Sequence, residues 1–137
     1  MELKEKYEEI MKKEVRYEGY MIDDAEIIIV SFGTSSRVCK SSIQMVRENG
    51  IKVGMIRPVT LWPFPSEIIS DLAKNTGVRA FLDVEMNYGQ MIEDVKLSVN
   101  GEKEVHFYGR TGGMLPDENE LYNKIMEVVN EYCIQET

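Results

Sequence analysis

The sequence predicts an α/β protein, a three-layer α/β/α sandwich around a mainly parallel sheet of four to five strands. Residues 27–30 form an unbroken apolar run, which is typical of a strand buried on both faces of a parallel sheet. Strand patterns then alternate with helix patterns along the chain, and this alternation favours right-handed crossovers. We expect the strand order 2-1-3-4, with an extra edge strand either near residues 17–21 or around residues 58–61.

Each predicted element ends at glycine, proline, asparagine or small polar residues, which interrupt regular structure. The apolar runs predict strands over residues 27–30, 51–57, 79–85 and 104–108. Helical spacing predicts a helix over residues 35–49, with Gly50 just beyond its end, and a second over about residues 65–74, with Pro65 in its first turn. A third helix is expected to follow a capping box at Asn87 and Gln90 and to end at Val99. A fourth is expected to follow an acidic cap at Asp117 and Glu120 and to reach Tyr132.

The chain is expected to divide into a lead-in over residues 1–22 and an α/β domain over residues 23–137. Residues 2–18 are dense in Glu and Lys, and their apolar residues recur near helical spacing, which predicts an amphipathic helix. Two interpretations remain open. The helix is either a linker that docks elsewhere or a segment that packs on this domain's own sheet.

Composition excludes several classes of protein. The net charge of −8 disfavours nucleic acid or an anionic membrane as a partner, because both select basic surfaces. The chain has no apolar run long enough to cross a membrane, and its first residues do not resemble a signal peptide. Cys39 and Cys133 stand far apart without a CxxC motif, so we expect free thiols, a cytoplasmic protein and no metal or iron–sulfur site in this chain.

Ligands of open α/β sheets bind beyond the carboxyl ends of the strands. In this sequence those ends are rich in glycines, hydroxyls and arginines, and they form a candidate rim for a ligand or a protein interface. The rim comprises Ser31, Gly33, Thr34, Ser35, Arg37, Arg57, Trp62, Phe64, Glu85, Asn87, Gly109, Arg110, Thr111, Gly112 and Gly113. The same residue types are common in β-α turns, so ordinary turns remain the alternative interpretation.

Two well-known phosphate-binding motifs are absent from the positions where this fold would carry them. The sequence contains no GxxxxGK[ST], and its first turn lacks GxGxxG. His106, the only histidine, is expected to be a packed or edge-strand residue, and Cys39 a small core residue. Glu85 would suit a general base, but we expect it to pair with an arginine of the rim.

Four segments, in this order, carry a resemblance to a known family: DAEIIIVSFGTSSR (24–37), GIKVGMIRPVTLWPFP (50–65), VEMNYGQM (84–91) and YGRTGG (108–113). They resemble the C-terminal, transketolase C-terminal-like domain of the alpha subunit of 2-oxoacid:ferredoxin oxidoreductases, those of 2-oxoglutarate and 2-ketoisovalerate above all. The resemblance covers about residues 20–130 and is specific to the family rather than to one substrate.

The resemblance implies an enzyme that oxidatively decarboxylates 2-oxoacids to acyl-CoA and reduces ferredoxin, with thiamine diphosphate, Mg, coenzyme A and iron–sulfur clusters. By this resemblance, we expect the 137 residues to include neither the pyrimidine-binding nor the gamma-like domain of such a subunit, nor any part that binds the diphosphate or a cluster. We therefore expect a non-catalytic assembly domain that binds no cofactor alone and contributes no catalytic residue. Its partners would be other domains and subunits, contacted through the Trp62–Pro65 arm and the Gly109–Gly113 rim, with ferredoxin only indirect and a homodimer left open.

One alternative function, a binding role rather than an assembly role, remains. The chain would then be a free-standing small-molecule binding module that holds an anionic ligand at the same rim. Binding of an anion is plausible on physical grounds, because helix N-termini and glycine-rich turns present backbone N–H groups.

Overall fold

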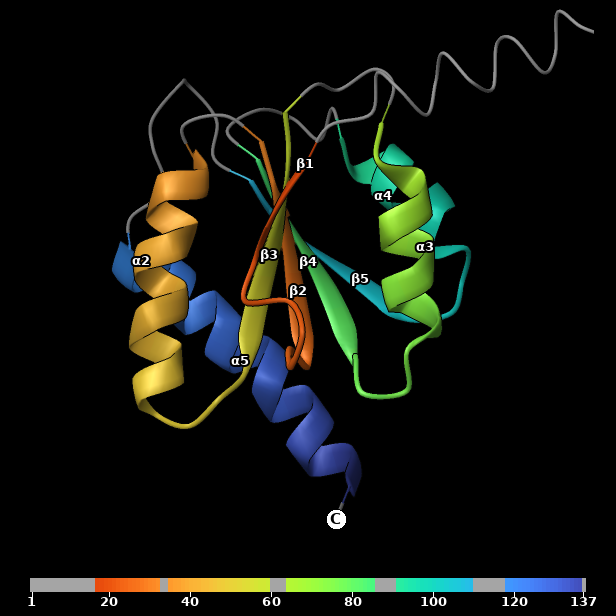
Figure 1. Cartoon of the computed structure of the whole chain (residues 1–137). Coiled ribbons are helices and arrows are strands. Elements are labelled where there is room, and N and C mark those ends of the chain that lie inside the picture. The colour runs from red at the N-terminus through yellow and green to blue at the C-terminus, as the bar shows by residue number, and fades with distance from the viewer. Residues whose placement is uncertain (1–16, 33–34, 60–63, 86–90, 110–117, 137) are drawn as a thin grey trace, which may run out of the picture.

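The computed structural model describes residues 17–32, 35–59, 64–85, 91–109 and 118–136, and for residues 132–136 the backbone alone. A five-stranded sheet lies between two pairs of helices, α2 with α5 on one face and α3 with α4 on the other (Figure 1). The elements are β1 (Tyr17–Tyr20), β2 (Ile27–Ser31), α2 (Ser35–Glu48), β3 (Val53–Pro58), α3 (Ser66–Lys74), β4 (Ala80–Glu85), α4 (Ile92–Val99), β5 (Glu104–Gly109) and α5 (Glu118–Glu136).

The strand order is β1-β3-β2-β4-β5, which confirms the predicted 2-1-3-4 order for the four parallel strands β2 to β5. β1 adds an antiparallel edge strand beside β3, so the first of the two predicted positions for an extra strand is the observed one. Tyr17 and Glu18 lie in this strand, and the helix predicted over residues 2–18 does not include them. Residues 1–16 lie outside the described residues.

Both faces of the sheet are apolar, as the continuous run in β2 predicted. All five residues of β2 are buried, and successive side chains point to opposite faces. Ile27 and Ile29 pack toward α2 and α5, whereas Ile28 and Val30 pack toward α3 and α4. The chain therefore builds two hydrophobic cores, one on each side of a shared sheet, as a three-layer sandwich requires.

The helix ends follow the sequence signals with small differences. Gly50 beyond α2 has φ +83, and Asn100 and Gly101 beyond α4 have φ values of 53 and 76, which suit the left-handed turn at a helix end. Pro65 is the N-cap of α3 rather than its first residue. The described part of α4 begins at Ile92 with Met91 as N-cap, while Asn87, Gln90 and Asp117 of the predicted caps lie outside the described residues.

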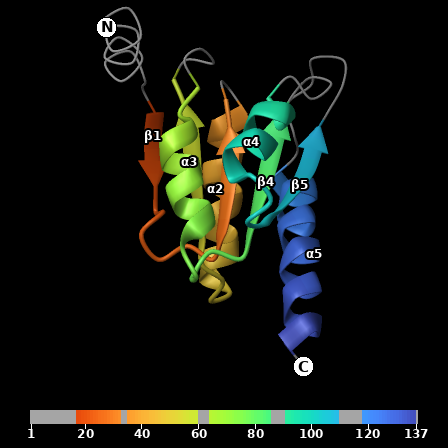
Figure 2. The same cartoon turned by 90° about the vertical axis from the view of Figure 1, so that its right-hand side faces the viewer.

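Seen from the side in Figure 2, α3 and α4 cover one face of the sheet, and α5 runs behind β4 and β5 and extends past the lower end of the strands. β1 and β5 are the two edge strands. Within the described ranges, no helix is long and apolar enough to cross a membrane.

Candidate functional site

The four parallel strands end at one edge of the sheet, the upper edge in Figure 1, at Ser31, Pro58, Glu85 and Gly109. Seven of the predicted rim residues are described there or close by: Ser31, Ser35, Arg37, Arg57, Phe64, Glu85 and Gly109. The remaining rim residues lie outside the described residues: Gly33, Thr34, Trp62, Asn87, Arg110, Thr111, Gly112 and Gly113.

At the end of β2, two buried serines form a short hydrogen-bond chain. The Oγ atoms of Ser31 and Ser35 are 2.7 Å apart, and Ser35 Oγ donates to the carbonyl oxygen of Phe32 at 3.0 Å. A hydroxyl has one hydrogen to donate, so Ser31 must donate to Ser35. This chain ties the last residue of β2 to the first turn of α2, and it uses the donor capacity of both hydroxyls inside the fold.

Cys39 follows one turn later in α2 and is fully buried, which confirms the prediction of a small core residue. Burial raises the pKa of the Cys39 thiol to about 12. The thiolate is the reactive form of cysteine. Cys39 is therefore protonated at neutral pH and serves as a core residue rather than a nucleophile.

At the end of β4, two carboxyl groups project from the face that α3 and α4 cover. Asp83 is fully buried and Glu85 is 8% exposed. Burial, together with a hydrogen bond to Glu85 and the nearby charge of Glu85, raises the pKa of Asp83 to about 9. Glu85 Oε1 accepts a hydrogen bond from the backbone N–H of Met91 at 2.7 Å, so this carboxylate lies at the positive end of α4.

With both groups ionised, Asp83 Oδ1, Asp83 Oδ2 and Glu85 Oε2 would find no hydrogen-bond donor among the described residues. A protonated Asp83 can donate its O–H to a Glu85 carboxylate oxygen, and this hydrogen bond explains why the pKa of Asp83 is raised. Sequence reasoning predicted the strand but missed Asp83. The available signal was a lone carboxylate between Leu82 and Val84, inside a run expected to be buried on both faces.

The other described rim residues differ in their surroundings. Arg57 Nη1 pairs with Glu18 Oε2 of β1 at 3.0 Å, directly across the antiparallel ladder. Glu85 makes no ion pair with an arginine in the described part of the chain.

Phe64 is half-buried against the α3 and α4 core, whereas Arg37 and Gly109 are exposed. His106 lies on the edge strand β5, as predicted.

Two apolar side chains also stand at this edge. Phe32 follows β2 and is 40% exposed, and Val59 follows β3 and is 41% exposed. β2 and β3 are neighbours in the sheet, so both residues mark the same part of the edge. Neither residue belongs to the predicted rim, because a single apolar residue after a strand gives no signal of its own.

These features define a class: an open, mainly parallel α/β domain in which several described strand-end polar groups, Ser31, Arg57 and Glu85, are held by contacts within the domain. The chain belongs to the family described as pyruvate:ferredoxin oxidoreductase core domain II, whose model matches residues 25–121.

Two curated relatives show how the chain compares with complete subunits. It is 48% identical over 129 residues to ketoisovalerate oxidoreductase subunit VorB of Methanothermobacter marburgensis, covering 94% of this chain and 36% of that subunit. It is 38% identical over 104 residues to 2-oxoglutarate synthase subunit KorA of the same organism, covering 76% of this chain and 27% of that subunit. The chain thus spans about a third of the length of the curated relatives that it matches.

Two solved structures share the fold. The 2-oxoglutarate:ferredoxin oxidoreductase from Magnetococcus marinus, with 2-oxoglutarate, coenzyme A and succinyl-CoA bound, matches with a TM-score of 0.69 and 19% identity over 89% of this chain and 21% of that chain. A split-gene transketolase, in an inactive beta4 tetramer, matches with a TM-score of 0.58 and 18% identity over 69% of this chain and 33% of that chain. The predicted transketolase C-terminal-like fold and the family resemblance are confirmed.

Proposed function

We propose that this chain is a non-catalytic assembly domain of a 2-oxoacid:ferredoxin oxidoreductase alpha subunit. The complete enzyme would oxidatively decarboxylate a 2-oxoacid to an acyl-CoA and reduce ferredoxin. One observation carries the proposal: the match covers 94% of this chain but only 36% of VorB. The reaction of a complete enzyme would therefore draw on residues outside the part that this chain represents.

The described edge of the sheet supports a structural role. The hydroxyls of Ser31 and Ser35 are hydrogen-bonded to each other, and Cys39 is a protonated thiol in the core. Arg57 is engaged by Glu18, and Glu85 by the start of α4. Since a nucleophile or general base must reach its substrate, these buried or engaged groups serve the fold better than a reaction.

Neither an iron–sulfur cluster nor Mg²⁺ suits the described residues at the carboxyl edge of the sheet. An iron–sulfur cluster is commonly held by four cysteine thiolates, whereas the sequence has two cysteines and burial keeps the Cys39 thiol protonated. Asp83 and Glu85 do not suit Mg²⁺ either, because Asp83 holds its proton and both groups are buried. We assign Mg and the clusters to other parts of the complete enzyme on these grounds, and thiamine diphosphate and coenzyme A as the family resemblance implies.

The exposed Phe32 and Val59 favour a protein neighbour at the carboxyl edge over an anionic small molecule. Apolar and aromatic side chains contribute most to the desolvated centre of a protein interface, whereas an anion selects cations and N–H groups. In this proposal the neighbours are other domains and subunits of the oxidoreductase, in the cytoplasm, and ferredoxin is reached only through them. This argument counts against a free-standing anion-binding module.

The test is a chimera. The segment of M. marburgensis VorB that matches this chain is replaced by the chain itself, and the chimera is produced with the companion subunits of that enzyme. We expect an assembled complex with ketoisovalerate-dependent reduction of a viologen dye. The isolated chain, given thiamine diphosphate, Mg²⁺, coenzyme A and the same 2-oxoacid, should give no reduction above a buffer blank.

A matched control separates assembly from folding. A second chimera carries this chain with Phe32→Asp and Val59→Asp, which leave the described core unchanged. It should fold by circular dichroism but assemble less completely on size-exclusion chromatography. Turnover by the isolated chain, or full assembly of this double variant, would contradict the proposal.

A further inference from the structure

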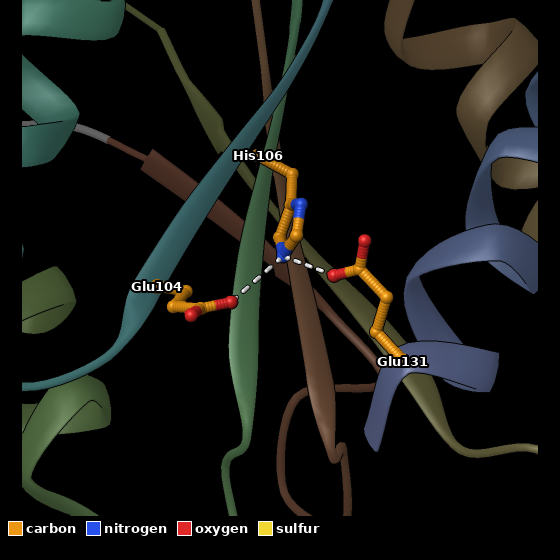
Figure 3. A group of neighbouring side chains, drawn as sticks. All are labelled: Glu104, His106 and Glu131. Carbon is orange, nitrogen blue, oxygen red and sulfur yellow. Dashed lines mark ion pairs between the residues drawn. The ribbon is translucent and has the colours of Figure 1, made fainter. Parts of the chain in front are cut away.

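A second cluster of side chains, remote from the carboxyl edge, joins the edge strand β5 to the last helix. Glu104 and His106 stand two residues apart on β5 and so share one face of the strand, while Glu131 comes from α5 (Figure 3). His106 Nε2 faces both carboxylates, at 3.5 Å from Glu104 Oε2 and 3.6 Å from Glu131 Oε2. The three ligand atoms all lie within 4.8 Å of one another.

These separations are those of ligands around one small cation. Ligand atoms about 2.0–2.2 Å from a Zn²⁺ ion, at a tetrahedral angle, lie about 3.3–3.6 Å from each other. A hydrogen-bonded pair of imidazolium and carboxylate would instead close to about 2.7–2.9 Å. The observed distances of 3.5 and 3.6 Å fit the first arrangement.

We propose that Glu104, His106 and Glu131 form a binding site for a divalent transition-metal ion of the Zn²⁺ class. An imidazole nitrogen with two carboxylate oxygens is a ligand set that Zn²⁺ accepts, and a water would complete the tetrahedron. Two carboxylates neutralise the charge of the ion. The imidazole selects a transition metal over Ca²⁺ and Mg²⁺, which take oxygen ligands.

The site would act as a clasp between the edge of the sheet and α5. The side chain of His106 is 17% exposed, whereas those of Glu104 and Glu131 are 65% and 50% exposed. One ligand is thus fixed by packing while the other two are open to solvent, so an ion can enter without any change in the core. Because the site lies on β5 and α5, it is independent of the function proposed for the carboxyl edge.

The test uses the untagged full chain, treated with a chelator and then titrated with Zn²⁺ alone. Isothermal titration should show one ion bound per chain, and thermal unfolding should shift to higher temperature, because an ion that binds only the folded state stabilises it. Glu131→Gln should weaken binding by at least about tenfold, since loss of even an outer partner of a metal ligand costs about 10- to 100-fold.

Two control variants make the result decisive. Glu127→Gln makes the same charge change on α5, at an exposed carboxylate that pairs with Lys124, and should bind Zn²⁺ as the wild type does. Cys133→Ser tests a thiol as the ligand instead and should also leave binding unchanged. The proposal is overturned if the wild type shows no saturable binding, if Glu131→Gln binds as tightly as the wild type, or if Cys133→Ser abolishes binding.

Discussion

Asp83 and Glu85 stand two residues apart on β4 and face the same side of the sheet, and Asp83 keeps its proton there at neutral pH. Burial and the hydrogen bond with Glu85 raise the pKa of Asp83 to about 9, while Glu85 is anchored by the backbone N–H of Met91. Two buried carboxylates this close cannot both ionise without a large cost. A proton is therefore a structural component of this fold at neutral pH.

The first prediction is that the stability of the domain falls as pH rises. The pKa of Asp83 is about 9 in the folded chain and near 3.8 in the unfolded chain, so between these values only the folded state holds the proton. Release of that proton on unfolding makes stability decrease with pH across this window, by at most about 1.4 kcal/mol per pH unit. Urea unfolding at several pH values between 5 and 8.5 measures the slope.

Asp83→Asn isolates the contribution of this proton. The amide keeps a hydrogen-bond donor toward Glu85 and cannot ionise, so the slope should flatten and the variant should exceed the wild type in stability by at least about 1 kcal/mol near pH 8. Asp71→Asn, at an exposed position of α3, is the matched control and should keep the wild-type slope. Equal slopes for Asp83→Asn and the wild type would show that Asp83 is ionised in the folded domain.

The second prediction concerns the serine chain at the start of α2. Ser35→Ala leaves the buried Ser31 hydroxyl without its acceptor and the Phe32 carbonyl without its donor, and should cost about 1–3 kcal/mol. Ser31→Ala removes a donor but leaves the bond from Ser35 to Phe32 intact, and should cost about 0.5–1.5 kcal/mol. Chemical denaturation of both variants measures the difference.

Ser41→Ala corrects for the higher helix propensity of alanine, because Ser41 lies in the same helix away from this turn. It should be neutral or slightly stabilising. A loss for Ser31→Ala as large as that for Ser35→Ala would reverse the direction that we assign to the hydrogen-bond chain.

The fold was predictable because its signals are local. A run such as residues 27–30 identifies a strand buried on both faces, and Gly50 and Asn100 mark helix ends wherever the rest of the chain packs. The family resemblance was predictable for the same reason, since its four segments are short and ordered. The edge strand β1 was harder to predict, because only its pairing with β3 shows that the extra strand lies near residues 17–21 rather than around residues 58–61.

The contacts of the site were not predictable, because they depend on tertiary register. Arg57 pairs with Glu18 since β1 places these residues opposite each other, and the sequence does not give that register. Asp83 stays protonated because it is buried beside Glu85, and the strand pattern alone does not predict that contact. Glu131 reaches His106 only because α5 packs on the face of the sheet that includes this side of β5. The function of the rim as an interface stays a prediction.

The third prediction tests how the chain enters β2. A Cβ on Gly54 of β3 would lie 2.6 Å from the carbonyl oxygen of Met21 and 3.0 Å from Ile22 Cα. The Met21 oxygen cannot yield easily, because Arg47 Nη2 donates to it at 2.9 Å and also holds Asp24. Backbone must therefore shift, and Gly54→Ala should destabilise the domain by about 1–3 kcal/mol.

Gly77→Ala is the matched control for this substitution. Its Cβ would meet only the Asn75 side-chain oxygen, at 3.3 Å, in an exposed turn. The control should change stability by no more than about 0.5 kcal/mol, as is usual for an exposed position. Thermal unfolding of the two variants at one pH makes the comparison. Melting temperatures that fall equally would mean that the connection from β1 to β2 moves freely over β3, and that the hydrogen bonds from Arg47 do not fix it there.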